Sequence, residues 1–502
     1  MTTSFTNWSE NLDTDQTIIY PTTDNGISNL IRQCRDRQLH LRVVGSGHSI
    51  SPLVLDNREN DVILVSLEKY KFTPEDITFF LDEAFVRVNA GWTLGQLYDY
   101  LDKHNCVLPT QPASSAFTIG GIISLPVHGS RLGRSFIAES VVALTLIDQD
   151  GEVRTKNTED EDFWLYCYGM GMMGIITSVT FRLEKYYNTL SSIQTHETVF
   201  SGNKVDRTVL DPVFTRLVEE CLAAESKGYY HHSFIDFHNN RLLCLDWHIE
   251  NNPSFSASKI DRRESRSVYK VRLAKFFHTY IFSSYRRHPW YLRLLGNISK
   301  WLITSATRLD SIDDRNMLWF SVGSAAYFME YFIPIQCIGK PICLDRLYKA
   351  LEILKEEAEA TRGSDFVIDL PISLRLITSD TYHHLSPLYS DEKQVYIAID
   401  VVCGVANLSL DSTSIRSGYQ NLNQVFRSFC SRVEQRWQEM GGIPHLGKMS
   451  GFSNGQDPFT DIETVRKGLN PELMRLLRLK SSPVFRNSYL ERLLSTYDPE
   501  DL

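Results

Sequence analysis

The chain has 502 residues, which is long for one hydrophobic core and suits two domains. Apolar residues make up 42% and charged residues 23%, the balance of an ordinary globular protein. The formal net charge of -9 argues against a nucleic-acid-binding surface, which needs clustered positive charge. We therefore expect a small-molecule substrate and no nucleic acid.

The cysteines and the N-terminus indicate in which cellular compartment the protein is expected. None of the nine cysteines forms a CxxC pair or stands at zinc-binding spacing, so a reducing compartment fits best and no metal site is predicted. The opening MTTSFTNWSENLDTDQ is polar and acidic, unlike a signal or transit peptide. No apolar run reaches the roughly 18 residues that span a bilayer. A cytoplasmic location is expected.

Many short strands and a few helices are predicted from residue 17 to about residue 184. The segments are a helix over 29–37, a strand over 39–44 that enters a glycine turn, strands over 61–66 and 85–90, a helix over 93–104, a hairpin from 141–148 to 152–154, and a strand over 175–183.

A second unit mixes both element types between about residues 185 and 440. Strands are predicted over 241–249 and 395–402, and helices over 343–361 and 414–440. The chain changes character at GGIP, residues 441–444, and ends in a Leu/Arg-rich helical stretch over 487–494.

Basic and aromatic residues interleave between residues 262 and 308. Such a stretch could make peripheral contact with an anionic membrane surface. The interpretation we favour is a pair of amphipathic helices that pack their aromatic side chains inward and expose their arginines to water.

The segment LRVVGSGHS, residues 41–49, carries the first functional motif. A buried strand runs straight into two glycines, which accept positive φ and permit close approach of another group. Successive amides in such a turn form a concave anion site suited to a pyrophosphate. Because position 50 is isoleucine, the GxGxxG fingerprint is incomplete, and the motif alone could be an ordinary tight turn.

Two further glycine-rich stretches follow, TIGGIISLPVHGS over 118–130 and YGMGMMGIITSVT over 168–180, with the LTLIDQDGEV hairpin between them. In order and spacing the three motifs resemble the FAD-binding domain of the vanillyl-alcohol-oxidase superfamily. The resemblance implies an α+β protein with a PCMH-type FAD-binding domain over 14–187, a mixed α+β substrate (cap) domain over 188–440, and a C-terminal segment over 441–502 that returns to the FAD domain. The FAD-binding residues that it implies are Val44, Gly45, Ser46, Gly47, His48, Ser49, Thr118, Gly120, Gly121, Ser124, His128, Gly129, Ser130, Ile175 and Ile176.

The resemblance also implies a covalent link between FAD and His48, since many relatives attach the flavin to the histidine of this loop. Such a link would raise the reduction potential of the flavin. The alternative is a turn histidine that only hydrogen-bonds backbone. One departure is visible, because relatives usually carry a Ser/Thr-x-Thr-His-Gly pattern where this chain has SLPVHG. Pro126 lacks a backbone donor, so a cofactor hydrogen bond there is missing or comes from Ser124.

The C-terminal part carries GGIPHLGK over 441–448, then LNP over 469–471 and NSYL over 487–490. These look like the tail of the aldonolactone oxidoreductases (D-arabinono-1,4-lactone oxidase, L-gulonolactone oxidase) and alditol oxidases. The resemblance implies that Lys448 offsets negative charge developing on the flavin or binds a substrate hydroxyl. It implies that His445 accepts the hydroxyl proton, or else orients its neighbours. Leu446 replaces the usual tryptophan, so an altered pocket wall is expected.

In the same enzymes a Glu-x-Arg pair on a substrate-domain strand contacts the reacting polyol. The matching segment here, PISLRL over 371–376, keeps Arg375 but has Ser373 in place of the glutamate. Serine can hydrogen-bond a hydroxyl but carries no negative charge. Two other acids could serve, Asp369 on the same parity of the predicted strand and Glu330 in a Met-Glu-Tyr segment.

The sequence thus predicts an FAD-dependent enzyme that oxidises a CH–OH group of a polyol or lactone, with the electrons passing to O2, giving H2O2, or to another acceptor. Two alternatives stay open. Ser373 and Leu446 favour an oxidase of a natural-product or carrier-linked alcohol, and the missing glutamate favours a flavin-binding relative that has lost catalysis.

Overall fold

The computed structural model describes most of the chain between Phe5 and Ser495. The described residues are 5–56, 61–72, 77–80, 83–112, 114–134, 136–185, 188–223, 229–250, 288–307, 326–337, 340–364, 366–381, 383–404 and 422–495. Two large antiparallel sheets with helices around them confirm the predicted α+β class.

The glycine motif follows a small parallel sheet in the N-terminal half. Strands β3 (His40–Val43) and β4 (Val62–Val65) pair with His40 opposite Val62. Helix α1 (Asp24–Asp36) precedes them and packs an apolar face on the core. β4 consists only of β-branched and aliphatic residues, which suit a buried strand, and β3 contributes Leu41 and Val43 beside the polar His40 and Arg42.

The larger sheet of this half has the strand order β5-β6-β10-β8-β9, and β7 pairs with β10. A capping box between Thr93 and Gln96 starts helix α2. The bounds are β5 (Thr78–Phe80), β6 (Glu83–Asn89), β7 (Cys106–Val107), β8 (Val141–Ile147), β9 (Val153–Asn157), β10 (Ile175–Lys185), α2 (Leu94–Lys103), α3 (Ile119–Ile123) and α4 (Phe163–Cys167).

A seven-stranded antiparallel sheet forms the other half, in the order β11-β15-β14-β17-β18-β16-β19. Its register places Ser373 of β17 and Glu330 of β16 directly opposite Asp400 of β18, so these three side chains share one face. The bounds are β11 (Asn188–Glu197), β14 (Tyr229–Asp236), β15 (Arg241–Glu250), β16 (Ala326–Cys337), β17 (Ile372–Thr378), β18 (Gln394–Gly404) and β19 (Ile443–Pro444).

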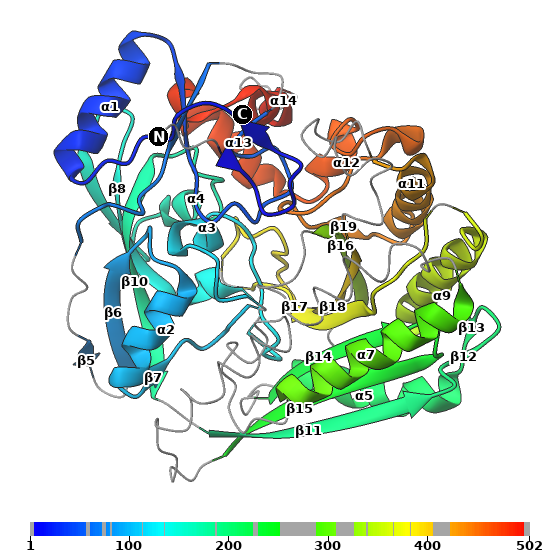
Figure 1. Ribbon diagram of the computed structural model, residues 1–502. Helices are drawn as coiled ribbons and strands as arrows, with labels where there is room; N and C mark the ends of the chain where they lie inside the picture. The colour runs from blue at the N-terminus through cyan, green and yellow to red at the C-terminus, as the bar shows by residue number, and fades with distance from the viewer. Residues whose placement is uncertain are drawn as a thin grey trace.

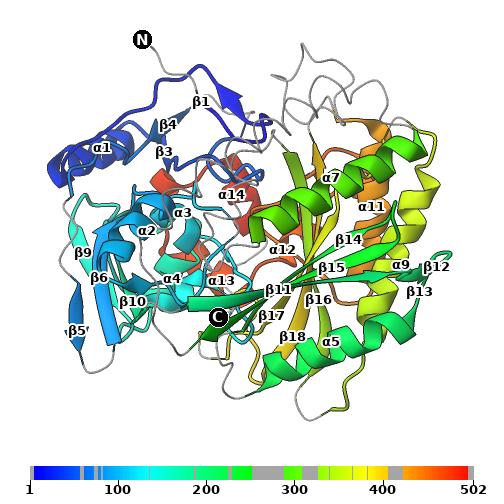
Figure 2. The ribbon, with the colours of Figure 1, turned by 60° about the horizontal axis from the view of Figure 1, so that its bottom comes forward.

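Helices cover both faces of this sheet (Figure 2). Ile303 of helix α7 packs with Phe234 of β14, so α7 lies on the face that carries Ser373, at the β11-β15-β14 end. The opposite face packs on α5, α9 and α11. These helices are α5 (Arg207–Leu222), α7 (Pro289–Thr307), α9 (Asp345–Ala360) and α11 (Gln424–Gln438). The uncovered part of the Ser373 face is free to line a site.

The C-terminal segment connects the two halves. After β19 it forms α12 (Ile462–Arg466), α13 (Pro471–Lys480) and α14 (Ser488–Leu494), and α13 and α14 lie against the N-terminal half (Figure 1). The Asn487 side-chain amide donates to the Pro52 carbonyl at 2.9 Å. Minor elements are β1 (Phe5–Thr6), β2 (Asp13–Thr14), β12 (Phe200–Ser201), β13 (Lys204–Val205) and short 3-10 helices over Ile137–Ser140, Ser453–Gly455 and Pro483–Phe485.

The structure tests several predicted elements. Nearly all of them exist with ends shifted by a few residues, the largest shift being α1, which begins five residues before the predicted start at residue 29. Of the helix predicted over 414–440, residues 414–421 lie outside the described part, and α11 covers 424–438. Strand β10, which ends at Lys185, belongs to the sheet of the N-terminal half, and β11, which begins at Asn188, belongs to the seven-stranded sheet. The predicted domain boundaries remain a prediction.

Most of the basic and aromatic stretch, residues 262–287 and 308, lies outside the described residues. Its described part includes helix α7, which buries Tyr291 but exposes Trp290 at 58% and Trp301 at 53%. The inward packing predicted for the aromatic side chains therefore holds for only some of them. None of the described helices combines the length and the apolar character needed to cross a membrane.

Candidate active site

A cavity of about 890 Å³ lies between the two halves of the molecule. One end is lined by the loop after β3 and by helix α3, and the other by the Ser373 face of the seven-stranded sheet. Its size falls in the range of cofactor and substrate sites, which is about 300–1,000 Å³. The predicted catalytic residues Lys448, His445, Arg375 and Ser373 all line it, together with Val44 to Ser49.

The loop from Gly45 to Ser49 has the geometry of an anion site. Gly47 has φ +67, which favours glycine, and a Cβ on Gly45 would stand 2.1 Å from the Thr118 hydroxyl. Among the residues that the structure describes, none accepts a hydrogen bond from the amides of Gly45 to Ser49. A run of unpaired amides at a cavity wall suits phosphate oxygens.

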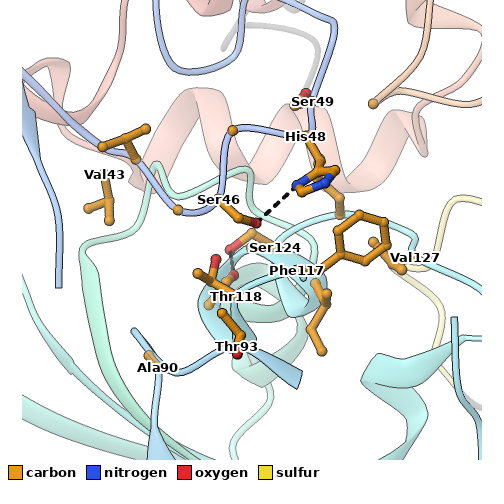
Figure 3. A pocket seen from close by; sticks show the side chains of 18 of the residues that line it. Val43, Ser46, His48, Ser49, Ala90, Thr93, Phe117, Thr118, Ser124 and Val127 are labelled. Carbon is orange, nitrogen blue, oxygen red and sulfur yellow. Dashed lines mark hydrogen bonds between the residues drawn. The ribbon is translucent and has the colours of Figure 1, made fainter. Parts of the chain in front are cut away.

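Helix α3 faces this loop across the cavity (Figure 3). Of the residues predicted to contact the flavin, six from this part of the chain line the cavity: Thr118, Gly120, Gly121, Ser124, His128 and Ile176. The Ser124 hydroxyl donates to the Gly120 carbonyl at 2.7 Å, so it can offer a cofactor only its acceptor lone pairs.

Three predicted cofactor residues do not line the cavity. A Cβ on Gly129 would stand 2.5 Å from the Gln111 carbonyl, so this glycine permits close backbone packing instead. The Ser130 carbonyl accepts from the His231 amide at 2.9 Å and so joins the two halves. Ile175 is fully buried in the core, while its neighbour Ile176 faces the cavity because strand side chains alternate.

His48 projects from the loop beside two aromatic rings. The Trp8 ring stacks on it at 5.5 Å, and the Phe117 ring meets it edge-on at 4.9 Å. Its Nδ1 shares a hydrogen bond of 3.2 Å with the Ser46 hydroxyl (Figure 3), and its Nε2 has no hydrogen-bond partner among the described residues. Burial, together with the charge of Lys448, lowers the pKa of His48 to about 4. The imidazole is therefore neutral, as a nucleophilic ring must be.

Glu330 stands at the centre of the sheet end of the cavity. His128 Nε2 lies 2.9 Å from its Oε1, and Arg375 Nη2 lies 3.9 Å from the same atom. Burial opposes ionisation of Glu330, but His128, His445 and Arg375 together hold its pKa well below the usual value. Burial also lowers the pKa of His128, so we assign a Glu330 carboxylate that accepts from a neutral imidazole.

One atom each of His128, Glu330 and His445 lie within 4.8 Å of one another, a spacing also found in metal sites. The His128–Glu330 hydrogen bond and the neighbouring guanidinium of Arg375 account for this cluster as a hydrogen-bond network. A cation there would meet the charge of Arg375 at close range.

The geometry argues against His445 as the proton acceptor. Its Nδ1 already accepts from the Gly447 amide at 3.0 Å, so its proton is on Nε2. Burial lowers the pKa of His445 to about 3, which makes the neutral ring a weak base. The arrangement fits the alternative, an orienting role.

Lys448 and Leu446 point to different places. The Lys448 ammonium lies 4.1 Å above the Phe328 ring at the cavity wall. Leu446 is 2% exposed, packs in the core and does not line the cavity. The prediction that Leu446 alters the pocket wall is therefore wrong, because its side chain faces the other way.

Of the two alternative acids, only Glu330 lines the cavity. Asp369 precedes β17 and is not on the strand, so the parity argument that placed it beside Ser373 fails. The cavity also contains residues that were not predicted from the sequence, Asp400, His232, Phe328 and Trp8. Asp400 left a signal, since it is a single acid inside the apolar run IAIDVV.

Comparison with known proteins identifies the half that holds the glycine loop. A family model described as "FAD binding domain" matches residues 16–156. These residues form an FAD-binding domain. The match confirms both the resemblance carried by the glycine motifs and the predicted cofactor, FAD. The domain also fits its ligand here, since the residues that line the cavity include the loop with its unpaired amides, the glycine beside Thr118, and His48, whose Nε2 has no hydrogen-bond partner among the described residues.

Relatives of the chain include sugar-lactone oxidases. It is 30% identical over 213 residues to D-arabinono-1,4-lactone oxidase of Candida albicans, covering 40% of this chain and 38% of that protein. It is 27% identical over 198 residues to L-gulonolactone oxidase of Mus musculus, covering 38% of this chain and 42% of that protein. The matches thus span about two fifths of these relatives.

Solved structures show the same fold over nearly the whole chain. Cholesterol oxidase from B. sterolicum superimposes with a TM-score of 0.69 at 15% identity, covering 98% of this chain and 96% of that one. A solvent-stable cholesterol oxidase gives a TM-score of 0.70 at 15% identity, with coverages of 99% and 95%. These likenesses confirm the predicted fold, an FAD-binding part joined to an α+β cap.

Proposed function

We propose that the protein is an FAD-dependent oxidoreductase that oxidises a CH–OH group of an aldonolactone or alditol. The observation that carries the proposal is a single cavity that runs from the FAD loop to a polar sheet face bearing Arg375, Ser373 and Glu330. An alcohol bound at that face would lie beside the cofactor. The names of the relatives, lactone oxidases, support the same substrate class.

The lining of the sheet end favours a substrate rich in hydroxyl groups. Arg375 is 8% exposed and its Nε has no hydrogen-bond partner among the described residues, so a donor is available to a substrate oxygen. His232 Nε2 and the Ser373 hydroxyl lie 2.8 Å apart beside it. An apolar polycyclic substrate would desolvate these groups without pairing them, which costs about 1–3 kcal/mol for each group.

Within this proposal each of the polar residues of the cavity has its own role. Bound FAD supplies the acceptor for the hydride. Arg375 holds a substrate oxygen, and Glu330, fixed by His128, keeps the guanidinium in place. The charge of Lys448 lowers the pKa of His48 at one end of the cavity and that of Asp400 at the other. Lys448 can therefore offset negative charge that develops in the space between these residues.

The purified flavoprotein mixed anaerobically with aldonolactones and alditols tests the proposal. We expect flavin absorbance to bleach with at least one of them, and peroxide to form when air is admitted. Arg375→Ala should slow bleaching at least about 100-fold, whereas Arg362→Ala, at an arginine 73% exposed just after α9, should not. Bleaching without peroxide would point to an acceptor other than O2. If no compound of either class bleaches the flavin, the proposal fails.

We also propose that the FAD is attached covalently through His48 and that the enzyme acts in the cytoplasm. His48 lines the cavity with a neutral imidazole whose Nε2 has no hydrogen-bond partner among the described residues, and this supports the attachment. The scattered cysteines support a reducing compartment.

A further inference from the structure

An unassigned acid, Asp400, lines the cavity beside the serine that replaces the glutamate of related enzymes. It lies on β18, directly opposite Ser373 on one neighbouring strand and Glu330 on the other. Directly opposed residues project from the same face of a sheet, with Cβ atoms about 4.5–5.5 Å apart. The cavity therefore holds a carboxyl group on the strand next to Ser373, one strand away from the position at which the resemblance leads us to expect a glutamate.

The hydrogen bonds of the two acids differ. Glu330 is held by His128 at 2.9 Å and has Arg375 at 3.9 Å. Asp400 is 5% exposed, and its Oδ1 has no hydrogen-bond partner among the described residues. A buried carboxyl oxygen without a partner is costly, and for a residue that lines a substrate cavity this cost is removed when the bound substrate supplies the hydrogen. Asp400 can therefore accept a hydrogen bond from a substrate hydroxyl, whereas Glu330 already shares a hydrogen bond with His128.

The charges around Asp400 also suit proton transfer. Glu330 acts on Asp400 from β16 and Arg375 from β17. His232 on β14 lies 2.8 Å from the hydroxyl of Ser373. Lys448 lies within electrostatic reach from the segment after β19. Burial and the Glu330 charge raise the pKa of Asp400 to about 7, against the opposing effects of Lys448 and Arg375. A base with a pKa near the working pH transfers protons efficiently.

We infer that Asp400 is a catalytic residue that accepts the hydroxyl proton of the substrate. This inference rests on the proposed function. In the step, the substrate O–H bond breaks and its proton joins a carboxylate oxygen of Asp400. The carbon–hydrogen bond breaks with its electron pair passing to FAD, and a C=O bond forms. The alcohol loses two electrons, which bound FAD would accept, and Asp400 later returns its proton to water.

Asp400→Asn keeps the size of the side chain but cannot accept the proton. We expect its anaerobic rate of flavin reduction to fall about 10²–10⁴-fold, the usual contribution of a general base. The wild-type rate should rise with pH through an apparent pKa near 7, and this rise should be absent from the variant. Asp369→Asn changes a buried acid that does not line the cavity, and it should keep both the rate and the pH profile.

A measurement without turnover accompanies the kinetics. Infrared difference spectra of the substrate-free flavoprotein between acid and alkaline pH should show a protonated-carboxyl band that titrates near pH 7 in the wild type and in Asp369→Asn, but not in Asp400→Asn. If Asp400→Asn does not fold, Asp400→Ala with added formate replaces it, and formate should restore much of the lost rate.

The outcomes separate the two proposals. An Asp400→Asn enzyme that reduces its flavin within a few-fold of the wild-type rate, or keeps the pH profile, overturns the role of Asp400 and leaves the proposed function intact. A wild type that no alcohol reduces overturns the proposed function and with it the catalytic role, even where the carboxyl band titrates. Failure of formate to rescue Asp400→Ala also overturns the role.

Discussion

Replacing Asp400 by asparagine should change how the stability of the protein depends on pH. The ordinary pKa of an unfolded aspartate is about 3.9, whereas burial and Glu330 raise the pKa of Asp400 to about 7 in the folded chain. The folded state therefore binds this proton more tightly, so the stability contributed by the protonated acid is present below about pH 4 and is lost as the pH rises to about 7.

The expected size follows from the shift. About three pKa units at 1.36 kcal/mol each give about 4 kcal/mol in total, of which about 2 kcal/mol is lost between about pH 5.5 and 8. Asparagine has no such proton. Between about pH 5.5 and 8 the free energy of unfolding of Asp400→Asn should therefore rise by about 2 kcal/mol relative to that of the wild type. For a domain of about 250 residues this is roughly 4 °C in thermal midpoint.

Thermal unfolding of the flavoprotein, followed by circular dichroism at the two pH values, measures this difference. Asp369→Asn is the matched control, since it removes another buried acid that lies outside the cavity. The difference in thermal midpoint between this variant and the wild type should be the same at both pH values. If the offset between Asp400→Asn and the wild type is the same at both pH values, Asp400 does not titrate in this range and the electrostatic argument is refuted.

Three further substitutions test other parts of the site. His48→Ala should abolish the flavin fluorescence that we expect on the protein band of a denaturing gel, and a fluorescent variant would disprove the link. Gly45→Ala should reduce bound FAD at least about tenfold, because its Cβ would enter the cradle at 2.1 Å from a hydroxyl; Gly95→Ala, with an ordinary nearest contact of 3.5 Å, should retain the cofactor as judged by absorbance. Arg375→Ala removes a cation that lowers the pKa of Asp400, so the carboxyl titration should move about one unit towards higher pH; a shift towards lower pH would contradict the assignment.

The FAD half could be predicted from the sequence because local motifs define it. The strand before Gly45, the helix that buries Leu94 and the hairpin around Gly151 all depend on neighbouring residues, and they form as predicted. Local patterns left open which of Ile175 and Ile176 meets the cofactor, since which of two adjacent side chains faces a cavity depends on the register of β10 with its partners.

The sheet end of the cavity depends on pairings that no local pattern specifies. Glu330, Ser373 and Asp400 are far apart in the chain and meet because β16, β18 and β17 pair in one register. Asp369 is a plausible acid from the sequence alone because local patterns do not fix the start of β17, which begins only at Ile372. Leu446 was interpreted as a wall residue because the direction of a loop side chain is a tertiary property.

We propose that the polar sheet face presents an alcohol to FAD bound at the loop after β3. Anaerobic titration of the purified flavoprotein with an aldonolactone, followed by its visible absorbance, tests this most directly. We predict that stoichiometric substrate bleaches the oxidised flavin bands. A protein that binds no FAD even when it is supplied, or whose flavin stays oxidised with every aldonolactone and alditol, would contradict the account.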